Sequence, residues 1–382
     1  MRVTRLQLAN WRNFKTVDVS LADRVFVLGP NASGKSNLLD AVRFLHELTM
    51  PAGGLYAAVG NRGGMSRLRF VNARNFNRGL LSVSVAIGDD DIPNVWEYEL
   101  ALKSSRPDLP AVAHEIVRHA GAVVYEQAPS TDPKLATQTA LEQVAANGPF
   151  RELAEYLSGI EYLHLVPQIV RDPARGVNLA RDPYGGTFLS EIGRSGQREW
   201  ERRRRVLTTA LRAAVPQFES LDRHQDRDGT WHLQAKYTTW RRSASAQDER
   251  DFSDGTLRLL GLLWVLLDRS KLGAPVLLEE PELSLHHDIL TLLPQLMATA
   301  SAGSGRQVLA TTHGVAMFDD DGVRPDEVVI LVPASEGTTV RLASADPLVE
   351  KLVSDGAFTL LEALRADLTV KSVRDLVTLK LA

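Results

Sequence analysis

The sequence predicts an α/β fold with a mixed sheet, an antiparallel β-subdomain at the N-terminus and a mainly helical insertion. Three observations predict it. Apolar and polar residues alternate from Met1 to about Ser20, which is typical of antiparallel strands. A glycine-rich turn at 29–36 lies between an apolar run and a segment with helical spacing. Three later apolar runs, APVLLEE, RQVLATTH and DEVVILV, are typical of buried parallel strands.

These elements divide the chain into four segments. Residues 1–102 form the first half of a core and include the strand-like runs LLSVSVAI and VWEYELAL. Residues 103–225 hold the helical patterns ATQTALEQVAANGPFRELAEYLSGI and QREWERRRRVLTTALRAAV, and we interpret them as an insertion. Residues 226–345 complete the core, and 346–382 form a helix-rich tail. The stretch 51–68 contains too many glycines to predict a regular element.

Composition excludes several classes of protein. The 382 residues carry 44 Lys+Arg against 47 Asp+Glu, so no overall basicity indicates a nucleic-acid partner. There is no cysteine, which excludes thiol catalysis, disulfides and cysteine-bound zinc within this chain. The longest apolar stretch, 257–280, is interrupted by Asp268, Arg269, Lys271 and Pro275, and the N-terminus lacks a signal-peptide core. We therefore expect no membrane association and a cytoplasmic location.

The turn at 29–36, GPNASGKS, has the spacing G-x-x-x-x-G-K-S. In this pattern backbone N–H groups cradle phosphates, the lysine reaches the β- and γ-phosphates and the serine hydroxyl binds Mg²⁺. The helix that follows adds the partial positive charge of its N-terminus. Gly29, Gly34, Lys35 and Ser36 therefore predict binding of ATP with Mg²⁺.

A pair of carboxylates ends the apolar run VLLEEPELSLHH at 276–287. Successive strand side chains point to opposite faces, so Glu279 and Glu280 cannot do the same work. We assign Glu279 to the metal and Glu280 to the attacking water. Together with the phosphate-binding turn, this pair predicts ATP hydrolysis.

Two further motifs complete the pattern. Ser253, Asp254 and Gly255 precede a long apolar helix and could form an anion site, which suggests a nucleotide shared with another subunit. Ser253 or Asp254 could equally serve only as a helix cap, and both interpretations stay open. His313 ends the strand-like run QVLATTH, where it could sense the γ-phosphate. Lys35, Glu280 and His313 are the candidate catalytic residues.

The order and spacing of these motifs resemble the ABC-type ATPase heads of the SMC and RecF superfamily. In detail the chain resembles the short, arm-less "AAA family ATPase" relatives that include the ATPase part of OLD-type proteins. The resemblance covers the N-terminal third and 231–342, so 1–102 and 226–345 would be the two halves of the head. It implies a Walker A motif at 29–36, a signature motif at 252–260 whose Ser253 and Gly255 contact the γ-phosphate in trans, and a nucleotide contact by Arg12. The implied nucleotide-binding set is Arg12, Gly29, Asn31, Ala32, Ser33, Gly34, Lys35, Ser36, Asn37, Ser253, Asp254 and Gly255, with Ser36 and Glu279 as metal ligands.

The chain departs from the family pattern at three points. Gly314 replaces the serine that usually follows the switch histidine. None of Gln7, Gln127 and Gln168 is well placed for the Q-loop glutamine, so one contact to Mg²⁺ or water is unassigned. The tail lacks the acidic cluster of a TOPRIM nuclease. A nuclease would therefore have to be on another polypeptide or absent.

The sequence predicts a Mg²⁺-dependent ATPase that dimerises head to tail around ATP, or forms an assembly of such dimers. Its cycle would control DNA engagement or a separate nuclease or toxin effector, in phage defence or DNA repair. The alternative is a switch that acts only through a protein partner. A transporter ATPase subunit has the same motifs, but NWRNF, EEPE and the insertion argue against it. The local basic signals, Arg202–Arg205 and Arg241–Arg242, are more often a solvated helix face than a DNA site.

Overall fold

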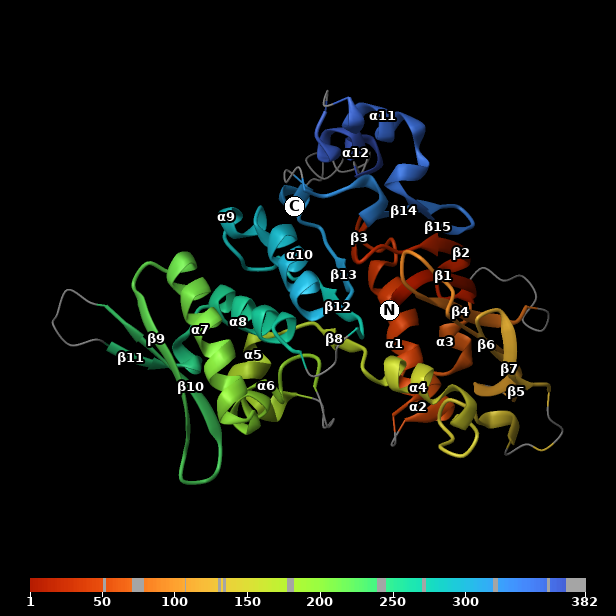
Figure 1. The fold of residues 1–382 in the computed structure, drawn as a ribbon, viewed down its shortest axis with the longest axis horizontal. Helices are drawn as coiled ribbons and strands as arrows, with labels where there is room; N and C mark the ends of the chain where they lie inside the picture. Colours follow the sequence, from red (N-terminus) through yellow and green to blue (C-terminus); the bar gives the residue numbers. More distant parts are fainter. Residues whose placement is uncertain are drawn as a thin grey trace, which may run out of the picture. The chain divides into compact units, whose positions relative to one another are not determined.

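A computed structural model describes residues 1–50, 53–70, 79–106, 108–129, 132, 135–176, 182–238, 245–269, 273–318, 322–355 and 358–368. The chain forms two compact units, coloured along the sequence in Figure 1. Unit 1 comprises Met1–Glu161, Gly273–Leu277 and Gly305–Ala382, and unit 2 comprises Tyr162–Leu272 and Leu278–Ser304. The chain passes between the units within two short strands, β8 (Glu161–Leu163) and β12 (Val276–Glu279).

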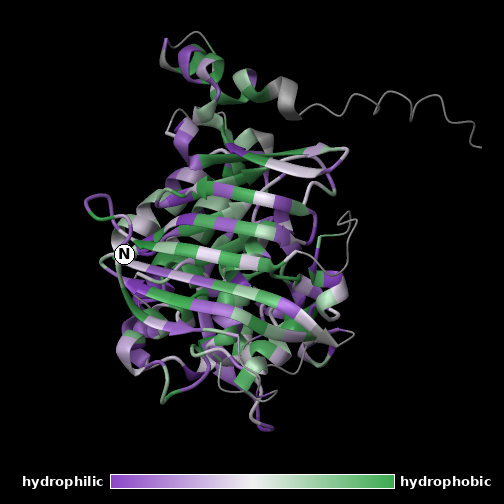
Figure 2. Ribbon diagram, turned by 90° about the vertical axis from the view of Figure 1, so that its right-hand side faces the viewer, coloured by the Kyte–Doolittle hydropathy of each residue, from purple (hydrophilic) through white to green (hydrophobic). Residues whose placement is uncertain are grey.

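The first sheet of unit 1 is antiparallel and has the order β2-β1-β4-β5-β6-β7. Polar and apolar residues alternate along its strands (Figure 2), and in β4 buried and half-buried positions alternate, as the sequence predicts. The sheet extends past residue 102 to Gln127. Its strands are β1 (Arg2–Trp11), β2 (Phe14–Ser20), β4 (Leu81–Gly88), β5 (Trp96–Arg106), β6 (Leu109–His119) and β7 (Ala122–Gln127).

The second sheet is mixed and has the order β15-β14-β3-β13-β12-β8. β13 (Val308–Thr311) and β14 (Val328–Ala334) run parallel to β3 (Arg24–Leu28), whereas β15 (Gly337–Leu342) is antiparallel to β14. All five residues of β3 are buried, which is typical of a strand covered on both faces. The predicted mixed α/β architecture is confirmed.

Gln307, which is buried at the start of β13, links the two sheets of unit 1. Its amide oxygen accepts from the Val3 backbone N–H at 3.0 Å, and its amide nitrogen donates to the carbonyls of Val3 at 2.8 Å and Ala22 at 2.7 Å. These bonds satisfy backbone groups of β1 that would otherwise be buried without partners.

Helix α1 (Lys35–Leu48) begins directly after the phosphate-binding turn and buries one apolar face in unit 1. The glycine-rich stretch predicted to be irregular instead contains two short helices, α2 (Gly54–Gly60) and α3 (Met65–Leu68). They form because Gly54 and Gly64 adopt positive φ angles of 81° and 87° and turn the chain at each helix start. The other helices of unit 1 are α4 (Arg151–Ser158), α11 (Pro347–Ser354) and α12 (Leu360–Leu368).

Unit 2 packs helices against a small antiparallel sheet of order β11-β10-β9. The predicted helix at 197–215 is confirmed as α7 (Gln197–Ala214), and its Trp200, Leu207 and Leu211 join the buried core. The remaining elements are α5 (Pro167–Arg171), α6 (Phe188–Arg194), β9 (Phe218–Gln225), β10 (Trp231–Tyr237), β11 (Ser245–Asp248), α8 (Asp254–Leu266), α9 (His287–Leu290) and α10 (Leu293–Ser304). Among helices in the described part of the chain, none is both long and apolar enough to cross a membrane.

The helix predicted from Ala136 to Ile160 is wrong over its first half, where the chain forms turns. Two carboxylates, one buried and one half-buried, accept hydrogen bonds from backbone N–H groups of this segment. Glu142 accepts from Thr139 at 2.5 Å and from Leu55, at the start of α2, at 3.1 Å. Glu115, fully buried on β6, accepts from the Ala140 N–H at 2.7 Å and from the Tyr98 hydroxyl at 2.9 Å. These bonds attach the turn to the antiparallel sheet.

We predict that protonation of Glu115 makes folding stability depend on pH. Burial raises the pKa of Glu115 from 4.5 to about 7, against the hydrogen bonds from Ala140 and Tyr98, which lower it. The folded state therefore binds one more proton than the unfolded state between these values, and stability falls as pH rises through that window. The fall is about 3 kcal/mol. Urea unfolding from pH 4.5 to 8 measures it.

Glu115→Gln should flatten this dependence, because the amide mimics the protonated carboxyl. Glu126→Gln, on the exposed side of β7, serves as the matched control and should keep the wild-type slope. An unchanged slope in Glu115→Gln would contradict the prediction.

Candidate nucleotide-binding site

The phosphate-binding turn connects β3 to α1 through left-handed backbone. Ala32 and Gly34 have φ angles of 62° and 99°. A methyl group on Gly34 would overlap the Asn13 amide, and one on Gly29 would lie 2.6 Å from the Ser33 hydroxyl and 2.7 Å from the Leu331 carbonyl. Close packing thus requires glycine at both positions, and at Gly34 the positive φ requires it as well.

Lys35 is the first residue of α1, and its side chain is buried. The ammonium donates to the carbonyls of Gly29 at 2.9 Å and Pro30 at 3.2 Å, and lies 3.4 Å from Nδ1 of His313. The structure therefore brings together two of the predicted catalytic residues, from the start of α1 and the end of β13. A buried ammonium among carbonyls at a helix start offers charge to an anion.

Asn13, which the sequence analysis missed, supports the turn from the β1–β2 hairpin. Its amide nitrogen donates to the Ser33 carbonyl at 2.8 Å and to the Thr338 hydroxyl at 2.9 Å, and its amide oxygen accepts from Asn37 at 2.8 Å. The side chain of Asn37, predicted to contact nucleotide, is thus used within the protein. The signal available in the sequence was the NWRNF opening itself, in which the second asparagine follows Arg12 by one position.

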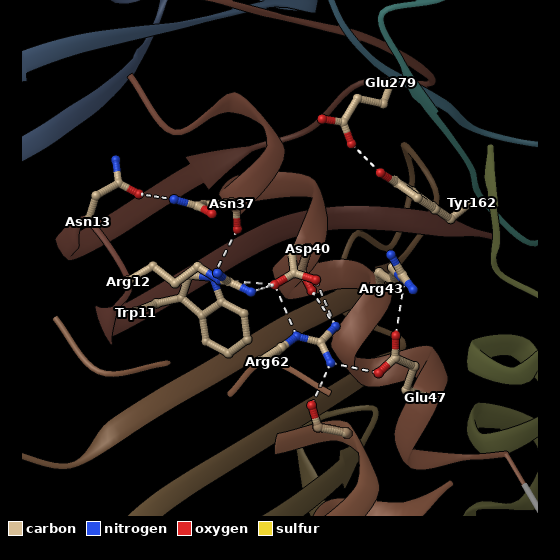
Figure 3. Close-up of polar contacts among 11 residues, drawn as sticks. Trp11, Arg12, Asn13, Asn37, Asp40, Arg43, Glu47, Arg62, Tyr162 and Glu279 are labelled. Atoms are coloured by element: carbon tan, nitrogen blue, oxygen red, sulfur yellow. Dashed lines mark hydrogen bonds and ion pairs between the residues drawn. The ribbon is translucent and has the colours of Figure 1, made fainter. Parts of the chain in front are cut away.

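Arg12 lies in a network of charges around α1 (Figure 3). Its guanidinium donates twice to Asp40, at 3.0 and 2.7 Å. Arg62, from the turn after α2, contacts Asp40 at 2.8 Å and Glu47 at 2.6 Å, and Glu47 also pairs with Arg43. Burial alone would raise the pKa of Asp40, but Arg62 and Arg12 outweigh it and hold that pKa below its ordinary value. In this structure Arg12, predicted to contact nucleotide, is bound to Asp40.

In unit 2, Glu279 of the carboxylate pair is the last residue of β12 and Glu280 follows it. The Tyr162 hydroxyl donates a hydrogen bond to Glu279 (Figure 3). Glu280 has a φ of 46°, which is rare for a residue other than glycine and costs on the order of 1–3 kcal/mol. Strain of this kind is concentrated at functional sites, where surrounding structure holds a side chain in one direction.

The predicted signature motif starts α8. The Ser253 hydroxyl accepts from the Thr256 N–H at 3.2 Å, so Ser253 does cap this helix. Asp254 pairs with Arg171 at 2.7 Å. A methyl group on Gly255 would lie 2.5 Å from the Ser284 carbonyl, so only glycine fits this approach of two loops. Ser253 is exposed, so capping leaves the helix start accessible.

Of the three glutamines set aside on sequence, Gln168 is the one that reaches a predicted nucleotide-binding segment. Its amide nitrogen donates to Asp254 at 3.4 Å. Gln7 donates to Asp18, and Gln127 donates to the Leu135 carbonyl, both in the antiparallel sheet. Gln168 is thus the candidate for the unassigned contact. The sequence signal was its place after the short strand β8, which itself was not predicted.

The residues present fit ATP with Mg²⁺. The turn presents the start of α1 and the Lys35 ammonium, and the buried Ser33 hydroxyl has no hydrogen-bond partner within the described part of the protein. Within the described residues, no cluster of three or more acidic or histidine side chains could hold a metal. Mg²⁺ typically takes one or two protein ligands and completes its shell with phosphates and water. Ser36, which is exposed, and Glu279 suit that mode.

The two units thus each hold part of the predicted set. Unit 1 holds Arg12, the turn from Gly29 to Asn37, and His313, whereas unit 2 holds Ser253, Asp254, Gly255, Glu279 and Glu280. The assignment of these residues to nucleotide, metal or water stays a prediction.

A buried strand, a left-handed glycine turn and a helix that begins at a buried lysine define a P-loop nucleotide-binding protein. The chain belongs to the AAA domain family described as putative AbiEii toxin, Type IV TA system, whose model matches residues 24–316.

Solved structures confirm the fold of an ABC/SMC-type ATPase head. The chain is similar to an SMC head bound to the C-winged helix domain of ScpA, with TM-score 0.52 and 14% identity over 89% of this chain and 97% of that one. It is also similar to the SMC head domain of Pyrococcus furiosus, bound to the C-terminal domain of ScpA, with TM-score 0.52 and 13% identity over 94% and 100%. No curated protein matches the chain. The finer resemblance to OLD-type proteins stays a prediction.

We predict that Gly34→Ala disrupts nucleotide binding. The added methyl group meets the Asn13 amide, and a φ of 99° costs an L-residue roughly 1–2 kcal/mol. Titration with a fluorescent ATP analogue should show at least tenfold weaker binding, with a lowered melting temperature. Gly60→Ala, in α2 with open space around it, is the matched control and should bind like wild type. Equal affinity of the two variants would refute the packing argument.

Proposed function

We propose that this protein is a Mg²⁺-dependent ATPase that dimerises head to tail around ATP and uses the cycle to control a protein effector. The contact between Lys35 and His313 at the phosphate-binding turn carries the proposal. It joins a phosphate-binding ammonium to a side chain able to sense what occupies the turn. The family match and the head fold support the same activity.

The residues divide the work as follows. Backbone N–H groups of the turn and the Lys35 ammonium bind the phosphates. Ser36 and Glu279 would hold Mg²⁺, which when bound neutralises phosphate charge. Glu280, in its strained conformation, orients and deprotonates the attacking water. His313, beside Lys35, senses the γ-phosphate, and Gln168 contributes the remaining contact to metal or water.

Dimerisation is supported by the start of α8. Ser253 is exposed, and Gly255 lets the helix start lie close to Ser284. Since the turn at 29–36 already offers one helix N-terminus to the phosphates, a second exposed one suits a nucleotide bound by another copy. We therefore propose that Ser253, Asp254 and Gly255 contact ATP held by the partner copy.

Three arginines of the basic run on α7, Arg202, Arg203 and Arg204, favour a protein effector over DNA. Arg203 is buried, donates to the Trp264 carbonyl at 3.0 Å and pairs with Asp268 at 2.9 Å. Arg202 and Arg204 pair with Glu199 and Glu201 along the helix. An arginine whose charge is already paired with a carboxylate of the protein contributes little to binding DNA phosphates. Arg241 and Arg242 lie outside the described residues.

Two observations on similar proteins fit an effector. SMC heads of this fold bind a domain of ScpA, and the family description names a toxin of a toxin–antitoxin system. We propose that a toxin or nuclease on a separate polypeptide is the effector, which would place the protein in phage defence. DNA engagement in repair is the second candidate.

We predict opposite results for two variants. Lys35→Ala should weaken ATP binding by roughly 100-fold, because a hydrogen bond to a charged group is worth about 1.5–3 kcal/mol. Glu280→Gln should bind ATP but lose roughly 10²- to 10⁴-fold in turnover, since it removes the general base. It should therefore accumulate as an ATP-bound dimer in size-exclusion chromatography with light scattering. A monomeric Glu280→Gln protein with normal turnover would defeat the proposal.

Turnover per protomer across a dilution series, with and without double-stranded DNA, separates the two candidates. A head-to-tail dimer loses specific activity on dilution. We expect no change with DNA, and DNA binding no stronger in 50 mM than in 200 mM salt. DNA-stimulated turnover with a steep salt dependence would instead favour the DNA candidate.

A further inference from the structure

Tyr162 contacts a residue of the proposed metal site without belonging to any of the predicted motifs. It lies in β8, whose neighbour in the sheet is β12, the strand that ends at Glu279. The Tyr162 hydroxyl donates to Oε2 of Glu279 (Figure 3), and both side chains are partly buried. This donor to Glu279 therefore comes from a strand and not from a loop.

We propose that Tyr162 is a positioning residue for Mg²⁺: its hydroxyl holds the Glu279 carboxylate in the orientation that the metal requires. The inference rests on the proposed function, which gives Glu279 to the metal. It adds a residue and a physical role that the nucleotide-binding motifs do not contain.

The first argument is conformational entropy. A glutamate side chain has three rotatable bonds, and ordering it costs up to about 1.5–2 kcal/mol. A tyrosine side chain has two rotatable bonds, and Tyr162 lies on a strand, β8. A hydrogen bond from Tyr162 orders the carboxylate before the metal arrives, so metal binding no longer bears that cost.

The second argument is the surroundings of the carboxylate. Glu279 lines a small cavity with Arg258 and five apolar side chains, Leu163, Leu165, Leu262, Leu278 and Pro281. A hydrogen bond is stronger beside apolar groups than in water.

Arg258 lines the same cavity as Glu279. Its Nε is buried without a hydrogen-bond partner among the described residues, and burial lowers the pKa of Arg258 against the attraction of Asp254, Glu280 and Glu282. The Glu279 carboxylate lines the same cavity and must be oriented to bind a metal. The Tyr162 hydroxyl supplies that orientation from within the protein.

Tyr162→Phe tests the proposal, because it removes the hydroxyl and keeps the ring. Mn²⁺ serves as the probe: it is titrated into the ATP-loaded full chain, and free Mn²⁺ is read by electron paramagnetic resonance. We expect 10- to 100-fold weaker Mn²⁺ binding, the usual cost of losing a hydrogen bond to a metal ligand. The Mg²⁺ concentration for half-maximal turnover should rise equally. Binding of a fluorescent ATP analogue in EDTA should not change.

The matched control is Tyr237→Phe, which removes a hydroxyl from β10 of the same unit and should leave Mn²⁺ binding at the wild-type value. In a Glu279→Gln background, Tyr162→Phe should have no further effect, since the carboxylate it orients is gone.

Three results would overturn the proposal. The first is a Tyr162→Phe titration that superimposes on wild type. The second is an equal loss of ATP binding in EDTA, which would make the role structural. The third is an undiminished effect of Tyr162→Phe in the Glu279→Gln background. Failure of the ATP and metal assignment on which this inference rests is distinct, because the wild-type chain itself would then bind neither ATP nor Mn²⁺.

Discussion

The packing of the Asn13 amide against Gly34 is the constraint on which the phosphate-binding turn depends. Gly34 has no side chain, so the β1–β2 hairpin can reach the turn and hold the Ser33 carbonyl and the Asn37 amide. The same hairpin is tied to β15 through the Thr338 N–H, which donates to the Asn13 carbonyl at 3.0 Å. One contact therefore couples the antiparallel sheet, the mixed sheet and the start of α1.

Charged side chains in this protein are used largely to hold elements together. Asp40 and Glu47 of α1 bind Arg12, Arg43 and Arg62. Arg202 and Arg203 of α7 bind Glu199 of the same helix, and Arg203 also binds Asp268, just after α8. Breaking one partner of a buried pair leaves an uncompensated charge, which is far more costly than losing a surface pair. A run of arginines is therefore weak evidence for a nucleic-acid partner until its neighbours are known.

The two short strands β8 and β12 also carry residues of the proposed metal site. They are the strands in which the chain leaves one unit and enters the other, and they carry Tyr162 and Glu279 on neighbouring positions of the sheet. Glu280, in its strained conformation, directly follows β12, and Gln168 lies on α5, the first helix after β8. Groups proposed to bind metal and water thus lie on these two strands or in the segments that follow them.

The sequence by itself determined the phosphate-binding turn, α1, α7 and the mixed architecture, because these follow from glycine spacing and from apolar periodicity within a few residues. It also indicated Glu279, Glu280 and His313, since each ends an apolar run. Only the tertiary structure decided which side chains contact the predicted site residues. Asn13 is 21 residues before Gly34 in the sequence, Tyr162 is 117 before Glu279, and no local pattern marks either pair. The same reason explains the wrong helix at 136–150: local spacing favoured it, but Glu115 and Glu142, one of them from a distant strand, took its backbone N–H groups.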